Sequence, residues 1–490
     1  LSEIYDLEAV AELLYWDQAT YMPPKAVAAR SRQFARLKAL AHERKTDPAL
    51  GRLLDRLEPY AETLPHDADE GALIRVARRD FEQARRVPAA FTEAFYAHTA
   101  RTYELWTEAR PKNDFARLLP ALEKTLEMSR RYAEFFPEAA HPADPLIDRA
   151  DHGMKTETLR ALFRELRQRL VPLVRAITSQ PRPDCAFLHR HYPREAQLRF
   201  GEAVIRKLGY DFERGRQDLT HHPFMIKFSL DDVRITTRVK EDDLTEALFG
   251  TIHEAGHAMY EQGIAPGYEG TPLADGASMG LHESQSRLWE NIVGRSLPFW
   301  RHFYPQLQAA FPEQLRDVSL EAFHRAINCV SPSLIRTDAD EVTYNLHIML
   351  RFDLEVELLE GGLALAELPD AWNARFQEDF GLEVPNHADG VLQDMHWFID
   401  FIGGQFQSYT LGNLMSAQLF AAAVKAEPGI PEAMAQGDFT PLRAWLRDEI
   451  HRHGRKYTAA ELIEAATGQP MSIEPFMNYL YEKYRTLYEF

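Results

Sequence analysis

The sequence predicts a mainly α protein with one small antiparallel β-sheet. Apolar residues recur at helical spacing over long segments, one short region alternates instead, and we find no internal repeat or low-complexity tract. Of the 490 residues, 45% are hydrophobic and 27% are charged, which is a globular composition able to bury a sizeable core. No stretch reads as an interdomain linker, so we expect a single large domain over residues 1–490.

Helical periodicity is clearest in two segments. Residues 113–136 and 156–178 place leucine and phenylalanine side chains three or four residues apart. Thr156 is the expected N-cap of the second segment. Pro172 is expected to kink or end that helix, because proline lacks the backbone N–H. Residues 437–453 and 473–488 show the same pattern, so helices are expected along most of the chain.

One region breaks the helical pattern. Apolar or β-branched residues occupy every second position in 224–228 and again in 233–237. The residues Leu230, Asp231 and Asp232 lie between these two runs. Such an arrangement is typical of a hairpin, and we expect it to form the antiparallel sheet directly before the segment 243–263.

Charge and cysteine usage exclude several classes of function. The formal net charge is −18, and an acidic protein repels phosphate backbones, so no nucleic-acid partner is expected. No uncharged apolar stretch approaches ~18 residues, so no membrane span is expected either. Cys185 and Cys329 are too few for a disulfide framework, and the acidic start does not read as a signal peptide. These features favour a cytoplasmic setting.

Residues 243–263 carry the strongest functional signal. Asp243 followed by Glu246 resembles a capping box at the start of an amphipathic helix. His253 and His257 lie four residues apart, so they share one helix face and can bind one Zn²⁺. Glu254 adjoins the first histidine and is suited to act as the general base of a metallopeptidase.

A catalytic zinc normally takes a third protein ligand and keeps one position open. Several acidic residues downstream could supply it, namely Glu261, Glu269, Asp275, Glu283 and Glu290. Residues 278–296 are expected to be helical and contain the last two, but periodicity does not choose between Glu283 and Glu290.

Six motifs in order resemble the carboxypeptidase Taq family of zinc metallocarboxypeptidases, over nearly the whole chain. They are His222-Pro223-Phe224, Asp232-Val233-Arg234-Ile235-Thr236, His253-Glu254-Ala255-Gly256-His257, His282-Glu283-Ser284-Gln285, Ile335-Arg336-Thr337-Asp338-Ala339-Asp340 and Gly390-Val391-Leu392-Gln393-Asp394-Met395-His396-Trp397.

The resemblance implies Glu283 as the third ligand of one Zn²⁺ per chain, with Co²⁺ or another divalent ion as alternatives. It also implies a helical fold, with two lobes flanking a deep substrate groove, and a cytoplasmic homodimer. The implied substrates are peptides with a free C-terminus, accepted with broad preference except where the last residue is proline.

A carboxypeptidase must also recognise the terminal carboxylate, for which arginine is suited. Arg336 is the candidate by resemblance, and the alternative is an ion pair with Asp338 or Asp340. Arg234 and Arg238 are weaker candidates, and His222 is a candidate for shaping the groove.

Peptide hydrolysis builds negative charge on the carbonyl oxygen, and a positioned donor stabilises it. Tyr409 and His396 are the candidates, with a packed core tyrosine and a satisfied core histidine as the structural alternatives.

These assignments predict a metal-assisted reaction. Zinc lowers the pKa of its bound water, and Glu254 takes the proton and delivers it to the leaving amine. Two other functions fit part of the same pattern. A groove-type zinc oligopeptidase could use the same helix, and a helical scaffold could hold a structural metal, although such a site would not need Glu254.

Overall fold

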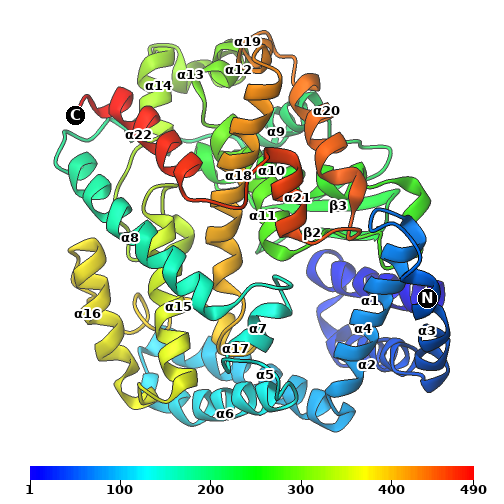
Figure 1. Ribbon diagram of the computed structural model, residues 1–490. Coiled ribbons are helices and arrows are strands. Elements are labelled where there is room, and N and C mark those ends of the chain that lie inside the picture. The colour runs from blue at the N-terminus through cyan, green and yellow to red at the C-terminus, as the bar shows by residue number, and fades with distance from the viewer. The chain divides into compact units, whose positions relative to one another are not determined.

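The computed structural model describes residues 1–490 and consists of helices and one three-stranded sheet, which confirms the predicted fold class (Figure 1). The chain divides into two compact units, each assembled from three separate stretches. The first unit comprises Leu1–Arg85, Pro183–Asn328 and Gly412–Ser472, and the second comprises Arg86–Arg182, Cys329–Leu411 and Ile473–Phe490. That residues 1–490 act as one catalytic domain stays a prediction.

The first unit contains the sheet and most of the helices. Its strands are β1 (Gln217–Leu219), β2 (Met225–Ser229) and β3 (Asp232–Thr237). Its helices are α1 (Ser2–Thr20), α2 (Val27–Lys45), α3 (Pro48–Ala61), α4 (Asp69–Arg86), α9 (Arg194–Leu208), α10 (Leu244–Gly263), α11 (Met279–Arg287), α12 (Leu297–Ala310), α13 (Pro312–Leu315), α14 (Leu320–Ile327), α19 (Ile430–Ala435), α20 (Thr440–Glu449) and α21 (Ala459–Thr467).

The second unit is entirely helical. Its helices are α5 (Ala89–Ala109), α6 (Phe115–Glu134), α7 (Asp144–Asp148), α8 (Thr156–Thr178), α15 (Tyr344–Glu360), α16 (Leu368–Phe380), α17 (His396–Ile399) and α22 (Glu474–Tyr488). Within this unit, α15 packs against α6, α8 and α16, and most of its side chains are buried. The long helix α18 (Phe406–Ala426) begins in this unit and continues into the first.

The sheet has the strand order β1-β3-β2. Strands β2 and β3 pair antiparallel, with Met225 opposite Ile235, so the predicted hairpin is confirmed. Strand β1 pairs parallel with β3, with Gln217 also opposite Ile235 on the other side, and the sequence did not predict it. A three-residue strand is too short to show an alternating pattern, and its pairing depends on a partner far along the chain.

The helix α10 begins where the sequence predicts and ends at Gly263. The Asp243 side chain caps it by accepting hydrogen bonds from the backbone N–H groups of Thr245 and Glu246, at 2.7 and 3.2 Å. The predicted capping box is only half formed, because Glu246 forms ion pairs with Arg238 and Lys240 in place of a contact with the Asp243 backbone. Because α10 packs against α9, α11, β2 and β3, it is buried on several faces and forms the centre of the first unit.

Two predictions about α8 need correction. The N-cap is Lys155, and Thr156 is instead buried, where its N–H and hydroxyl both donate to Asp144. The helix does not end at Pro172, which lies inside Thr156–Thr178, and a kink at this position stays a prediction. Pro172 lies on the exposed face, where water can satisfy the carbonyl that loses its partner, while buried Leu173 and Val174 hold the turn against the core.

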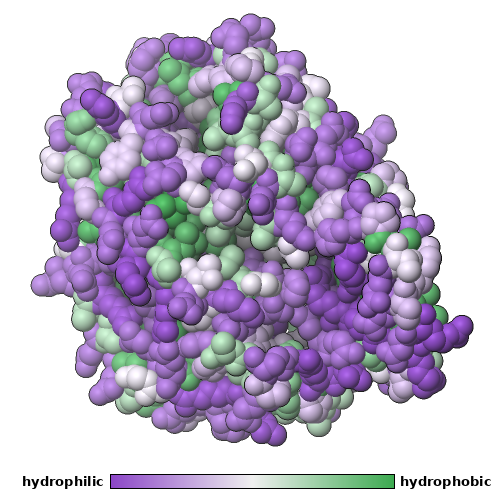
Figure 2. All heavy atoms as spheres, viewed as in Figure 1, coloured by the Kyte–Doolittle hydropathy of each residue, from purple (hydrophilic) through white to green (hydrophobic).

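The surface fits the charged composition. Hydrophilic residues dominate the face shown in Figure 2, and hydrophobic residues appear on it as limited patches. No helix is both long enough and apolar enough to cross a membrane.

Candidate metal centre

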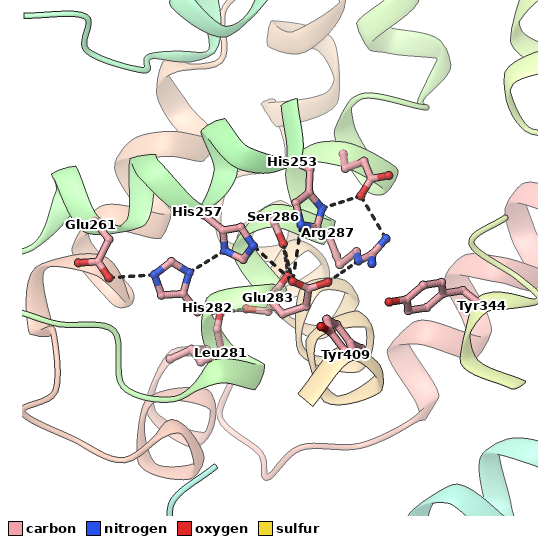
Figure 3. Close-up of polar contacts among 12 residues, drawn as sticks. His253, His257, Glu261, Leu281, His282, Glu283, Ser286, Arg287, Tyr344 and Tyr409 are labelled. Carbon is pink, nitrogen blue, oxygen red and sulfur yellow. Dashed lines mark hydrogen bonds and ion pairs between the residues drawn. The ribbon is translucent and has the colours of Figure 1, made fainter. Parts of the chain in front are cut away.

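Three predicted ligands converge in the first unit. His253 and His257 project from one face of α10, and the Glu283 side chain reaches them from α11 (Figure 3). Glu283 Oε2 lies 3.7 Å from His253 Nε2 and 3.4 Å from His257 Nε2. The three candidate ligand atoms all lie within 4.8 Å of one another.

This spacing fits a divalent metal ion. Ligand atoms about 2.1 Å from a tetrahedral ion lie about 3.4 Å from one another, close to the two distances from Glu283 Oε2. Two imidazole nitrogens and one carboxylate oxygen also form the donor set of a catalytic zinc site with one open position. The side chains therefore suit a catalytic ion, whereas a structural site usually has four protein ligands.

A glycine allows α11 to approach α10 closely enough for this convergence. A Cβ atom at Gly256 would lie 2.7 Å from Ser286 Cα and 2.8 Å from Gln285 O, closer than real Cβ contacts. Gly412 on α18 makes a similar approach, because its Cβ would lie 2.5 Å from Glu283 Cγ. Both positions must therefore be glycine, because any side chain there would push Glu283 out of place.

A second carboxylate holds His253 from behind. Glu290 Oε2 lies 2.8 Å from His253 Nδ1, the nitrogen that faces away from Glu283. Arg287 connects the two acids, donating from Nε to Glu283 Oε1 at 2.7 Å and from Nη1 to Glu290 Oε2 at 3.2 Å. Of the two acids that the sequence left open, Glu283 thus faces both Nε2 atoms, whereas Glu290 orients one imidazole.

His257 is held in a different way, through a second histidine. Its Nδ1 lies 2.6 Å from His282 Nδ1, and His282 Nε2 lies 2.8 Å from Glu261 Oε1. Lys227 on β2 donates to Glu261 Oε2 at 2.6 Å. A chain of polar contacts therefore runs from the sheet to this imidazole (Figure 3 shows its part from Glu261 to His257).

The electrostatics of the centre separate its acidic groups. Burial favours the neutral form of Glu283, but Arg287 and His253 hold its pKa well below the ordinary range. Burial raises the pKa of Glu254 to about 7, with His253 opposing the shift and Glu283 adding to it. Glu254 is only 7% exposed. One acid is thus kept as a carboxylate, while its neighbour is poised to gain or lose a proton near neutral pH.

The second unit contains the predicted arginine in a separate cluster. Arg336 is buried and donates to Asp394 through Nε at 2.5 Å and through Nη2 at 3.3 Å. Its Nη1 donates to the Tyr344 hydroxyl at 3.0 Å. The expected alternative of an ion pair with Asp338 or Asp340 is wrong, because Asp394 takes that place.

His396 and Tyr409 belong to the same cluster. His396 Nδ1 lies 2.5 Å from Asp394 Oδ1, and its Nε2 lies 3.1 Å from the Tyr409 hydroxyl. Arg351 also reaches Asp394, at 3.2 Å. Burial favours the neutral form of Asp394, but Arg336 and His396 hold its pKa well below the ordinary range. Asp394 is therefore the shared anion that orients Arg336 and His396, and His396 in turn contacts Tyr409.

The three remaining predicted residues lie in or beside the sheet. Arg238 follows β3 directly, and it donates to Glu246 through Nε and to His221 O through Nη1, the latter at 3.2 Å. Arg234 on β3 donates to Asp232 through Nε and Nη2, both at 2.8 Å, and lies over the Trp16 ring at 4.5 Å. His222 is exposed and precedes β2, so it is not part of the strand. Their contribution to substrate binding stays a prediction.

Sequence reasoning missed the residues that hold the ligands. It gave no role to His282 or Asp394, although both belong to motifs shared with the carboxypeptidase Taq family. It left Glu261 and Glu290 as possible ligands. Helical spacing offered one signal, because Glu283, Arg287 and Glu290 follow at i, i+4 and i+7 and therefore share a face. No comparable pattern links Lys227 to Glu261, whose contact depends on how β2 packs beside α10.

Known proteins resemble this chain over its whole length. A family model described as carboxypeptidase Taq (M32) metallopeptidase matches residues 1–484. Thermostable carboxypeptidase 1 from Thermus thermophilus is 42% identical, over 98% of this chain and 96% of that protein. Carboxypeptidase 1 from Bacillus subtilis is 37% identical, over 98% and 95%. The crystal structure of an M32 carboxypeptidase from Deinococcus radiodurans is 50% identical, covers 100% of this chain and 98% of its own, and has a TM-score of 0.97.

Proposed function

Because this chain belongs to the carboxypeptidase Taq (M32) family of metallopeptidases, we propose that it releases single residues from peptide C-termini with a zinc ion held by His253, His257 and Glu283. Family membership makes the protein a metallocarboxypeptidase, a peptide hydrolase that uses a divalent metal ion. The identity of the ion, the residues that hold it and the steps of the reaction are the proposal.

The observation that carries the proposal is the convergence of three ligand atoms beside a buried acid. His253 Nε2 and His257 Nε2 both face Glu283 Oε2, and Glu254 follows His253 directly in α10. A divalent ion bound there supplies Lewis-acid polarisation of the scissile carbonyl and lowers the pKa of a water molecule.

Glu254 is the proposed general base. A base works best when its pKa lies near the operating pH, and burial raises the pKa of this carboxyl to about 7. We propose that Glu254 accepts the proton of the attacking water and then delivers it to the amine that leaves. The same carboxyl therefore serves both halves of the reaction.

Arg336 is the proposed anchor for the substrate's terminal carboxylate. A guanidinium has five N–H groups, and the contacts to Asp394 and Tyr344 use three of them. The other two are on Nη1 and Nη2, which can bind a carboxylate through two parallel hydrogen bonds. Because Arg336 is buried and fixed by Asp394, it would lose little side-chain entropy when it binds this group.

Tyr409 is the proposed donor to the carbonyl oxygen, with His396 as the residue that orients it. Both ring nitrogens of His396 have partners in the second unit, Asp394 at one end and Tyr409 at the other. A phenol has one proton, so Tyr409 can donate it to the carbonyl oxygen when His396 carries protons on both nitrogens, donating Nδ1–H to Asp394 and Nε2–H to the phenol oxygen. A positioned donor of this kind is worth ~2.7–4 kcal/mol in the transition state.

A two-peptide assay tests the proposed function. One peptide has a free C-terminus and its twin is amidated, and mass spectrometry follows the products with zinc-loaded protein. Stepwise loss of single residues from the free peptide alone is expected. Internal cleavage of both twins would instead make the enzyme an endopeptidase and remove the need for Arg336 as an anchor.

The resemblance supports further proposals about specificity and assembly. We propose broad preference for the last residue with poor cleavage of C-terminal proline, which a peptide set varied only at that position would test. We also propose a cytoplasmic homodimer, and sedimentation equilibrium of the purified protein would measure its mass. Cobalt fits the same ligands, so elemental analysis of protein purified without added metal decides which ion it carries.

A further inference from the structure

His257 and His253 are supported by different partners, although both offer Nε2 toward Glu283. A carboxylate holds His253 directly, since Glu290 Oε2 accepts from its Nδ1. For His257 the partner is the imidazole of His282, which can either donate or accept at Nδ1. Whether His257 carries its proton on Nδ1 therefore depends on the other hydrogen-bond partner of His282.

The contacts beyond His282 allow only one arrangement of protons that leaves His257 Nε2 able to bind a metal. A ligating Nε2 requires the proton on His257 Nδ1, which must be donated to His282 Nδ1 at 2.6 Å. His282 must then carry its own proton on Nε2 and donate it to Glu261 Oε1 at 2.8 Å. As a carboxylate, Glu261 has no proton to donate and can only accept, so its charge sets the direction of hydrogen bonding through His282 to His257.

Lys227 keeps Glu261 in that state. Its ammonium group donates to Glu261 Oε2 at 2.6 Å, to Ala274 O at 2.6 Å and to Asp275 Oδ1 at 3.1 Å, which uses all three of its protons. Glu261 is 2% exposed, and this cation compensates for the burial of its charge. The ion pair therefore stabilises the carboxylate that His282 needs as an acceptor.

We propose that Lys227, Glu261 and His282 are positioning residues that fix the proton on His257 Nδ1 and so keep His257 Nε2 available to the metal. The proposal rests on the proposed ligand set of His253, His257 and Glu283. It assigns the strand β2, through Lys227, a part in metal affinity although none of its residues belongs to the proposed ligand set.

An isosteric substitution should reverse the direction of the hydrogen bonds that run from His257 through His282 to Glu261. In Glu261→Gln, the side-chain oxygen must face Lys227, because an amide NH₂ there would oppose an ammonium donor. The NH₂ group then faces His282 Nε2, which must accept, so the proton of His282 moves to Nδ1. His257 Nδ1 has to accept in turn and carries its proton on Nε2, where it blocks ligation.

Metal affinity measured by competition with a chelator tests this reversal. We expect Glu261→Gln to weaken Zn²⁺ binding by ~10–100-fold and to change the visible spectrum of the Co²⁺-loaded protein. Adding Lys227→Met should let the amide turn over, so the double variant should regain at least ~5-fold of the loss. Unchanged affinity in Glu261→Gln, or no recovery in the double variant, would overturn the proposal.

Control variants separate this proposal from general damage and from the proposed function. Glu12→Gln makes the same change beside another lysine, since Glu12 Oε1 lies 2.6 Å from Lys38 Nζ. Both residues line the cavity of about 520 Å³ that Lys227 and Glu261 also line. This variant should leave metal binding unchanged. If Glu261→Gln does not fold, His282→Phe removes the acceptor instead and should lose ~10–100-fold. Wild-type protein that binds no metal through His257 would refute the ligand set itself.

Discussion

Substitution of Gly256 by alanine tests whether close packing of α11 on α10 forms the metal centre. Gly256 precedes His257, and its Cβ position lies 2.7 Å from Ser286 Cα and 2.8 Å from Gln285 O. Both are backbone atoms of α11, so no flexible side chain can move aside. Carbon atoms in ordinary contact are about 3.5–4.0 Å apart, so the two helices must separate by about 1 Å.

That separation should affect metal binding far more than folding. Overpacking costs about 1–3 kcal/mol, and alanine recovers about 0.5–1 kcal/mol of helix stability, so the variant should fold. Glu283 moves with α11, however, and a metal site accepts changes in ligand distance of only about 0.2 Å. A shift of about 1 Å therefore removes one of three ligands, and we expect metal affinity to fall by at least ~100-fold.

Chelator competition and thermal unfolding of the metal-free protein measure the two effects separately. Gly250→Ala is the matched control, because Gly250 lies on the same helix and a Cβ there meets no atom within 4 Å. It should bind metal normally and be slightly more stable than wild type. Gly256→Ala protein that binds metal within about threefold of wild type would refute the packing argument.

Three further predictions concern single side chains. Glu254→Gln should retain metal but lose ~10²–10⁴-fold in kcat, as steady-state kinetics on zinc-loaded protein would show. Arg336→Met should lower kcat/KM for free peptides by ~10–100-fold, which is the worth of a charge-assisted hydrogen bond. A loss of kcat/KM no larger than that of a surface arginine variant would contradict the anchor. Asp379 is buried, which raises its pKa to about 6, so the folded state holds a proton that the unfolded state releases near pH 4. Stability should therefore fall between about pH 4 and 6, and urea unfolding of metal-free Asp379→Asn should lack about 2–3 kcal/mol of that decline.

The sequence predicted correctly those helices and strands that are marked by residues close to one another in the chain. Asp243 starts α10 as expected, because the cap and the helix it serves are neighbours in sequence. The hairpin of β2 and β3 is predicted for the same reason, since its alternation and its turn lie together. Strand β1 and the continuation of α8 through Pro172 depend on packing against distant residues, which periodicity does not report.

In the candidate site, too, features set by neighbouring residues were predicted, whereas contacts between distant segments were not. The spacing of His253 and His257 predicted that two imidazoles share a face, and they do. The partner of Arg336 was predicted among nearby acids, but it is Asp394, 58 residues away. Contacts between segments follow from the fold as a whole, so the sequence alone could name the chemical groups but not the residues that orient them.

Anomalous diffraction from crystals of the zinc-loaded protein, recorded at the zinc absorption edge, tests the central claim most directly. We expect one strong peak per chain, bounded by His253 Nε2, His257 Nε2 and a carboxylate oxygen of Glu283, with Glu290 on the far side of the His253 ring. A peak at Glu261 and His282, or ligation by Glu290 in place of Glu283, would contradict it.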